Sequence, residues 1–159
     1  MTQVHQIRIW IPLAVGACAV ICTILIHALA LLATVNFFRY ESRVGRTGRS
    51  LWIDLPIVSL VITFAFIAHL IEIAVWAALF RICGEFQEFA IAYYHSAVNY
   101  TTLGYGDIIM SPSWKLLGPI EAADGALMFG VSTAMIFAVI QRLLLARFED
   151  LRNERFPEP

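Results

Sequence analysis

Three long apolar runs constrain the fold of this chain more than any other feature. They extend from about Trp10 to Phe38, from Leu55 to Phe80 and from Pro119 to Leu145. Each exceeds the roughly 20 apolar residues that an α-helix needs to cross the hydrocarbon core of a bilayer. The second run is entered through "DLPI", where Asp54 is expected to cap the helix and Pro56 to lie in its first turn. The sequence therefore predicts an all-α membrane protein with three transmembrane helices.

The charge content supports a membrane protein and argues against several other classes. Only 14% of the residues are charged, whereas a soluble domain has about a quarter. No long basic run indicates a nucleic-acid partner, and three scattered cysteines do not predict a disulfide framework or a zinc site. No nucleophile–base pair or phosphate loop stands in a context that supports an enzyme, so we expect no catalytic residues and no cofactor.

A fourth segment, between the second and third runs, is helical in pattern but too short to span a bilayer. It reads "EFQEFAIAYYHSAVN", residues 85–99, is aromatic on one side, and is followed by a loop that contains two glycines. A short helix and loop between two spans predict a re-entrant hairpin. Irregular backbone at membrane depth is tolerated only where it is buried in protein or lines a water-filled cavity. We therefore expect the loop to be part of a pore or of the protein core.

The loop sequence "TTLGYGD", Thr101 to Asp107, resembles the selectivity-filter signature of potassium channels. Read alone it is also compatible with an ordinary glycine turn, but its position after a short helix between two spans favours the filter. The resemblance covers roughly Phe86 to Gln141 and implies a pore helix, a filter and an inner helix, with the second run as the outer helix. It resembles the prokaryotic type, with one extra transmembrane helix at the N-terminus.

The residue types in the loop suit a cation filter. An ion that leaves water needs oxygens in place of its hydration shell, and main-chain carbonyls supply them if successive ones point to one axis. This geometry needs left-handed backbone at alternate positions, which Gly104 and Gly106 adopt without steric cost. The resemblance implies K+ sites at the carbonyls of Thr102, Leu103, Gly104 and Tyr105, and a supporting or outer-mouth role for Thr101, Gly106 and Asp107.

The resemblance also implies roles for side chains around the predicted filter. Tyr105 is expected to pack behind the filter, with its hydroxyl tethered to the short helix. Leu103 stands where valine or isoleucine is commoner, which puts filter stability in doubt. Val98 occupies a position where some members carry a glutamate bonded to the filter aspartate, so Asp107 is expected to find another partner here.

A single loop supplies one oxygen per layer and cannot replace a hydration shell. Because the chain contains one copy of the motif, we expect a homotetramer, with three further copies of the chain as partners and K+ as the permeant ion. The expected function is passive, potassium-selective conduction. The alternatives are a weakly selective cation channel and a non-conducting membrane subunit that keeps the pore hairpin.

Arginine distribution predicts the orientation in the cell membrane, plasma or inner. The connection between the first two runs carries Arg39, Arg43, Arg46 and Arg49 against one acid, and the C-terminal segment carries Arg142, Arg147, Arg152 and Arg155. By the positive-inside rule both segments are cytoplasmic, so this multi-pass protein has its N-terminus and its hairpin outside. In a rival interpretation the first run is a signal peptide cleaved after "ALA" at 28–30, which would invert the rest.

The expected organisation has three parts. Residues 1–50 form the additional helix and an arginine-rich cytoplasmic loop, 51–145 the pore domain, and 146–159 a cytoplasmic tail too short for a ligand-sensing domain. The first run lacks the regular arginine repeat of a voltage sensor, and His27 is its only ionisable residue, so we expect no steep voltage dependence.

The third apolar run contains candidate gating residues and two acidic residues. Gly125 and Gly130 are candidate hinges, although glycine also permits close helix packing, and Phe137 is a candidate constriction. Glu121 and Asp124 are three residues apart on one helix face. They are either acids near the cavity that attract cations or structural acids bonded to the short helix or to His69.

Overall fold

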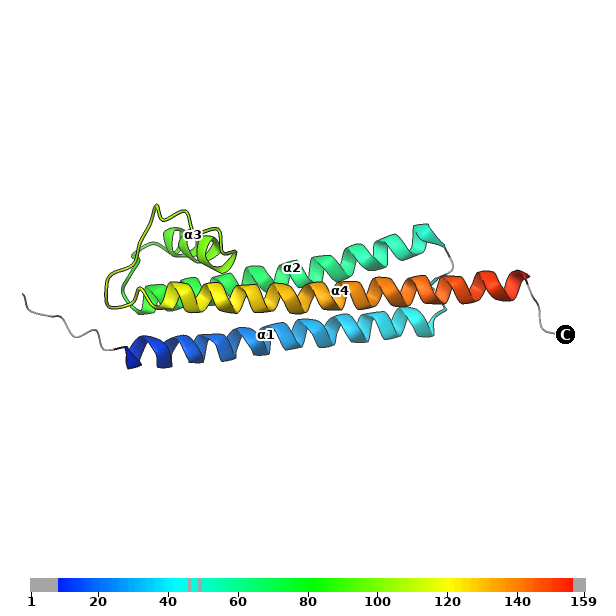
Figure 1. The fold of residues 1–159 in the computed structure, drawn as a ribbon, viewed down its shortest axis with the longest axis horizontal. Helices are drawn as coiled ribbons and strands as arrows, with labels where there is room; N and C mark the ends of the chain where they lie inside the picture. The colour runs from blue at the N-terminus through cyan, green and yellow to red at the C-terminus, as the bar shows by residue number, and fades with distance from the viewer. Residues whose placement is uncertain (1–8, 46, 49, 156–159) are drawn as a thin grey trace, which may run out of the picture. The chain divides into compact units, whose positions relative to one another are not determined.

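The computed structural model describes residues 9–45, 47–48 and 50–155, and these form four helices (Figure 1). The helices are α1 (Trp10–Arg43), α2 (Leu51–Ile82), α3 (Phe89–Tyr100) and α4 (Leu117–Arg155). Arg46 and Arg49 of the predicted cytoplasmic loop lie outside the described residues. The predicted fold class, three long helices with a short helix between the last two, is confirmed.

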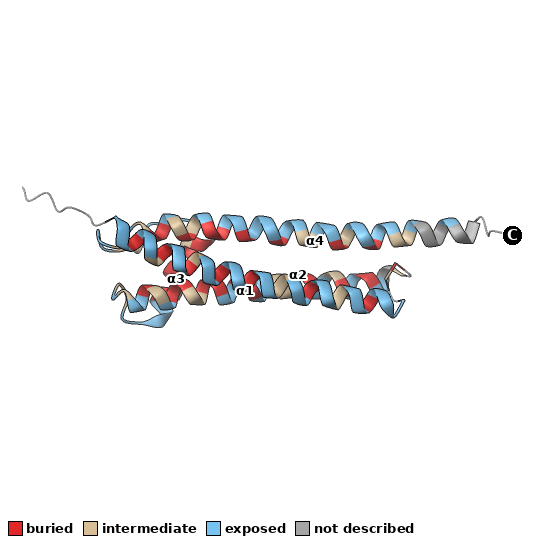
Figure 2. Ribbon diagram, turned by 90° about the horizontal axis from the view of Figure 1, so that it is seen from below, coloured by how far each residue is buried: buried red, intermediate tan, exposed pale blue. Residues whose placement is uncertain are grey.

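The three long helices are long and apolar enough to cross a membrane, over Trp10–Arg43, Trp52–Ile82 and Leu117–Phe148. Only 22% to 33% of each apolar stretch is buried within the chain, and Figure 2 shows buried residues as narrow bands along exposed helices. A soluble protein does not leave apolar patches of this size uncovered. The chain is therefore a membrane protein with three candidate spans, and its exposed faces are available to lipid or to other subunits.

The second helix begins earlier than predicted. The Ser50 carbonyl accepts hydrogen bonds from the N–H groups of Ile53 and Asp54, both at 3.0 Å, so α2 starts at Leu51. The prediction that Asp54 caps the helix was wrong. Its Oδ1 instead accepts a bond of 2.9 Å from the Gly48 N–H in the preceding loop, and Pro56 lies inside the helix, beyond the first turn. The Ser50 hydroxyl, which accepts from the Trp52 N–H at 3.4 Å, takes the capping position that the sequence assigned to the Asp54 carboxylate.

The chain divides into two compact units, and each long helix contributes a segment to both. Of the described residues, the first unit contains 9–27 and 69–129, and the second contains 28–68 and 130–155. The first unit thus includes α3, the candidate filter and the flanking parts of α1, α2 and α4. Every site residue expected from the sequence, except Gly130 and Phe137, belongs to it.

The first unit has a core of large side chains from all its helices. Trp76 and Phe80 of α2 are fully buried beside Tyr100, the last residue of α3, and Leu117, the first of α4; Ala19 of α1 joins them. Lipid is as apolar as these side chains, so close packing and hydrogen bonds, more than exclusion of water, hold the helices together. The end of α3 is consequently fixed within this core.

The second unit is built on a smaller apolar cluster. Ile57 and Val61 of α2 pack with Val139 and Leu143 of α4, and Phe37 of α1 packs against this cluster. The rings of Phe37 and Phe64 meet edge to face, with 6.0 Å between their centroids. The core cluster of the second unit is therefore apolar. The buried polar network described below belongs to the first unit.

Candidate functional site: the segment after α3 and the buried acids

The candidate filter starts in the turn that ends α3. The Thr102 N–H donates to the Asn99 carbonyl at 2.8 Å, and the Leu103 N–H donates to the Val98 carbonyl at 3.0 Å. This pair of bonds is the Schellman motif, which places a left-handed residue just beyond the helix. That residue is Thr102, with φ +60°. Left-handed backbone costs a residue with a Cβ about 1–2 kcal/mol, so the tight turn holds Thr102 in an unfavourable conformation.

The sign of φ alternates along the segment that follows. Gly104 has φ +60° and Gly106 φ +70°, and in the described part of the chain Thr102 is the only residue other than glycine with positive φ. Leu103 and Tyr105 therefore have negative φ. Alternating left- and right-handed residues rotate successive peptide planes so that neighbouring carbonyls turn toward one side of the chain. A segment of this kind can present a row of main-chain oxygens.

These residues are uncovered in the single chain. All seven from Thr101 to Asp107 are exposed, and Tyr105, expected to pack behind the filter, has 66% of its surface accessible. The main chain around Gly104 and Gly106 borders a hollow of about 570 Å³, whose other side is the start of α4 at Gly118 and Ala122. Any surface that covers the ring of Tyr105 must therefore come largely from outside the chain.

Two acids hold the ends of this loop. The Tyr94 hydroxyl of α3 donates to Asp107 Oδ2 at 2.8 Å, and this bond to a carboxylate raises the pKa of Tyr94. Glu85, before α3, accepts from both the N–H and the hydroxyl of Ser111, at 2.7 and 2.6 Å. Asp107 thus has a partner on α3, and Glu85 ties the chain before α3 to the chain after the candidate filter.

His95 of α3 is buried, and its ring packs against two phenylalanines. Its ring lies 5.4 Å from that of Phe80 and 4.9 Å from that of Phe86, and its Nε2 accepts from the Asn99 amide at 2.9 Å. Burial lowers the pKa of His95, because a charged imidazolium is poorly solvated there. The accepting Nε2 fits the neutral imidazole.

The two acids of α4 are buried and bonded within the chain. Ser96 of α3 donates its hydroxyl to Glu121 Oε1. Asp124 Oδ2 accepts from the Thr23 hydroxyl of α1 at 2.8 Å and from the Trp76 indole of α2 at 2.9 Å. The residue exposures are 0% for Glu121 and 2% for Asp124. Glu121 therefore joins α4 to α3, and Asp124 joins α4 to α1 and α2.

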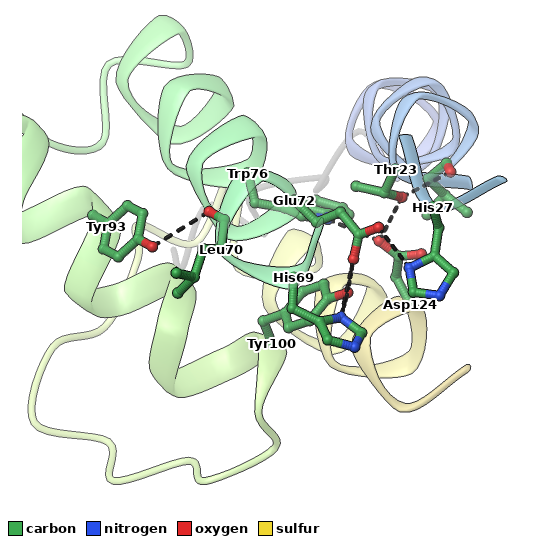
Figure 3. A network of polar contacts seen from close by, with 10 residues as sticks. Thr23, His27, His69, Leu70, Glu72, Trp76, Tyr93, Tyr100 and Asp124 are labelled. Carbon is green, nitrogen blue, oxygen red and sulfur yellow. Dashed lines mark hydrogen bonds and ion pairs between the residues drawn. The ribbon is translucent and has the colours of Figure 1, made fainter. Parts of the chain in front are cut away.

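A third buried acid, Glu72 of α2, is the centre of a polar network (Figure 3). Its Oε1 lies 2.9 Å from His27 Nδ1 of α1, and its Oε2 lies 3.2 Å from His69 Nδ1. The Tyr100 hydroxyl donates to the same Oε2. The network therefore connects the additional N-terminal helix to the residue that directly precedes the candidate filter.

The sequence did not predict several residues that form these hydrogen bonds. Thr23, Trp76 and Tyr100 have no sequence signal of their own, because hydroxyl and indole side chains are common in apolar runs. For Glu85 and Ser111 a weak signal exists: an acid and a serine flank the glycine loop, one before the short helix and one after the filter.

The candidate hinge glycines differ in their surroundings. A Cβ added at Gly125 would lie 2.1 Å from the Tyr100 carbonyl oxygen, so this glycine allows α4 to touch the end of α3. At Gly130 nothing lies within 4 Å of an added Cβ. Phe137, the candidate constriction, is 65% exposed.

Comparison with known families agrees with this arrangement. A family model described as "Ion channel" matches residues 56–142, more than half of the chain, from the second turn of α2 through α3 and the loop into α4. The chain belongs to this ion channel family, which is not a family of enzymes. Comparisons with curated proteins and with solved structures gave no match.

Proposed function

We propose that the protein is a potassium-selective channel, which conducts K+ passively through a backbone-carbonyl filter in a homotetramer. The observation that carries the proposal is the alternation of φ at Thr102, Gly104 and Gly106 within "TTLGYGD". Removing water from a cation costs far more than a protein can offset without direct oxygen ligands. A row of carbonyls on one side of the chain supplies such ligands and leaves ions free to move by mutual displacement.

Each residue of the segment has a proposed part. The carbonyls of Thr102, Leu103, Gly104 and Tyr105 form the ion sites, and Thr101, Gly106 and Asp107 support the filter and its outer mouth. The carbonyl end of α3 lies directly before the ion sites, where its partial negative charge favours a cation. The bond from Tyr94 to Asp107 holds the outer end of the segment to α3.

The tetramer follows from the ligand count and is supported by exposure. One chain gives one oxygen per layer, so four are needed to surround the ion. In the single chain Leu103 is 55% exposed, and Tyr105 and the hollow beside Gly104 are uncovered. Three further copies around one axis would cover these surfaces. The pore domain would comprise 51–145, with α1 as an addition to it.

The proposed orientation places the arginine-rich segments in the cytoplasm and the filter on the outer side. Arg39 and Arg43 are at the end of α1, and Arg147 and Arg152 are near the end of α4. Opening would bend α4 at Gly130, which has open space around it, and Phe137 beyond it would form the constriction. Gly125 is a poorer hinge, because it is packed against α3.

Reversal potentials of the purified protein in planar bilayers test the proposal. With opposed K+ and Na+ gradients, we expect the reversal potential to follow the K+ gradient. A potential that responds equally to both ions would support the weakly selective alternative. Absence of rubidium flux into liposomes that contain only this protein, at any pH or membrane tension, would support the non-conducting subunit.

A further inference from the structure

We propose that His27, His69 and Glu72 bind a divalent transition-metal ion of the Zn2+ class inside the membrane-spanning part of the first unit. One ligand atom from each residue lies within 4.8 Å of the others, and all three residues are buried. His27 comes from α1, and His69 and Glu72 are three apart on one face of α2. The proposal does not depend on the protein conducting K+.

The spacing of the donor atoms fits the coordination shell of such an ion. In a tetrahedral shell with metal–ligand bonds of about 2.0–2.1 Å, neighbouring ligand atoms lie about 3.3–3.4 Å apart. Glu72 Oε1 is 2.9 Å from His27 Nδ1, and Glu72 Oε2 is 3.2 Å from His69 Nδ1. The two distances are to different oxygens of the carboxylate, which lies between the two imidazoles (Figure 3). The three ligand atoms lie within 4.8 Å of one another, so an ion would draw the two rings closer together around the carboxylate.

The donor types select the class of metal. Two imidazoles and one carboxylate form a ligand set of zinc sites in which three protein groups leave one position for another ligand. The Tyr100 hydroxyl lies 3.1 Å from His69 Nδ1 and bonds to Glu72, so it is a further oxygen next to two of the three ligands. Imidazole favours Zn2+, Ni2+ and Cu2+ over Mg2+ and Ca2+, which prefer sites made only of oxygen.

The charges in this part of the protein also favour a bound cation. Three buried acids, Glu72, Glu121 and Asp124, lie in the first unit, and segments 10–27, 69–80, 89–107 and 117–129 contain no lysine or arginine. Buried carboxylates need a proton, a paired cation or a metal to offset their loss of hydration. Glu72 bonds to two histidines and a tyrosine, and a dication at this centre would balance more charge than one imidazolium.

A metal here would also give α1 a role. The ion would link His27 of α1 to His69 and Glu72 of α2 through coordination bonds. These ligands lie beside Tyr100 at the end of α3. Metal binding would therefore stabilise the docking of α1 on α2 and limit movement next to the candidate filter. The expected consequence is a protein that unfolds at a higher temperature with Zn2+ than without it.

Metal binding by the purified full-length protein tests the proposal. The protein is prepared with a histidine-free affinity tag, stripped with a chelator and titrated with Zn2+, and with Co2+ as a spectroscopic probe. We expect equimolar Zn2+ binding, a rise in the unfolding temperature, and the intense visible absorption bands of Co2+ in a low-symmetry N/O site. H27Q and H69Q should each weaken Zn2+ binding by at least about 10- to 100-fold, the loss that even outer-shell partners cause.

Matched controls use the two other histidines, His5 and His95. H5Q and H95Q should retain equimolar Zn2+ and the Co2+ bands, which H27Q should lose. Zn2+ binding that H27Q and H69Q leave unchanged would overturn the proposal, as would a failure of the wild-type protein to bind. If a variant does not fold, X-ray absorption at the zinc edge of the wild type decides, because a spectrum without two imidazole ligands contradicts the site.

Discussion

The carbonyl oxygen of Tyr100 lies 2.1 Å from the place that a Cβ would occupy at Gly125. Helix α4 therefore touches the last residue of α3 through bare backbone, immediately before the candidate filter. Tyr100 is held on its other side by its hydroxyl bond to Glu72. This one residue is thus fixed by α4 through its main chain and by α2 through its side chain.

Gly125→Ala is expected to separate α4 from the end of α3. A methyl group at 2.1 Å from a backbone oxygen cannot be relieved by a rotamer change, so one of the two helices must move. Overpacking of a core typically costs about 1–3 kcal/mol, and we expect at least that loss in the free energy of unfolding. Reversible unfolding in mixed micelles measures the loss, and rubidium flux reports its effect on conduction.

Gly130→Ala is the matched control for this substitution. It makes the same change in the same helix where nothing lies within 4 Å of the new Cβ. Alanine favours a helix interior by about 1 kcal/mol relative to glycine, so its stability should be equal or slightly higher. Equal destabilisation by both substitutions would contradict the close contact between Gly125 and Tyr100.

Gly104→Ala is expected to abolish conduction without preventing membrane insertion. Gly104 has φ +60°, and a side chain in that conformation costs about 1–2 kcal/mol. Relaxation to negative φ would rotate the adjoining peptide planes and remove carbonyls from the proposed ion sites. Rubidium flux into liposomes measures the loss, and protease protection of the inserted protein checks the spans.

Gly84→Ala imposes similar backbone strain away from the filter. Gly84 has φ +77° in the turn after α2, with nothing within 4 Å of an added Cβ. Conduction and the K+ to Na+ preference should be unchanged in this variant. If Gly104→Ala kept normal selectivity, the ion sites would have to lie elsewhere.

Acidification is expected to destabilise the first unit through His95. Burial lowers the pKa of His95 below its ordinary 6.5, although a hydrogen bond with the Ile108 backbone and the charges of Asp107 and Glu85 oppose the shift. The unfolded chain therefore takes up this proton first, and stability falls as the pH drops from about 6.5 toward the lower folded pKa. Unfolding temperatures measured across this range should decline on acidification.

His95→Gln provides the comparison, because glutamine keeps a hydrogen-bonding group near Asn99 but does not titrate. We expect the variant to be less stable at neutral pH, through its lost ring contacts with Phe80 and Phe86, and to show a flatter dependence on pH. An unchanged slope would assign the acid sensitivity to other groups.

The three spans were predictable because a long run of apolar residues is best accommodated by a bilayer-crossing helix. Gly104 and Gly106 permit the left-handed backbone that they adopt but do not impose it, and the positive φ of Thr102 comes from the turn that ends α3. The start of α2 was missed by four residues because Asp54 and Pro56 pointed to a later start, whereas the helix begins directly after Ser50, whose hydroxyl accepts from the Trp52 N–H. The sequence suggested the short helix or His69 as a partner of Asp124, whereas its bonds are to Thr23 and Trp76. Thr23 is 101 residues away, and the register between α1 and α4 depends on packing.

Thr23→Val is expected to weaken the attachment of α1 with little change in shape. The substitution removes the 2.8 Å bond from the Thr23 hydroxyl to Asp124 and leaves the indole bond of Trp76 in place. Hydrogen bonds between membrane helices contribute on average about 0.6 kcal/mol, with a maximum of about 1.7. Asp124 Oδ1 has no partner in the described chain, so the carboxyl is already incompletely satisfied and we expect a loss in the upper part of this range.

Thr63→Val is the matched control, because the Thr63 hydroxyl bonds only to the Ser59 carbonyl of its own helix, at 2.8 Å. Unfolding in mixed micelles should show a loss for Thr23→Val and almost none for Thr63→Val. Thr23→Val should also leave the K+ preference unchanged, since the bond joins α1 to α4 and does not involve the loop after α3. Equal stability of both variants would mean that the Trp76 indole alone satisfies Asp124, and that α1 is held by packing and by the contact of His27 with Glu72.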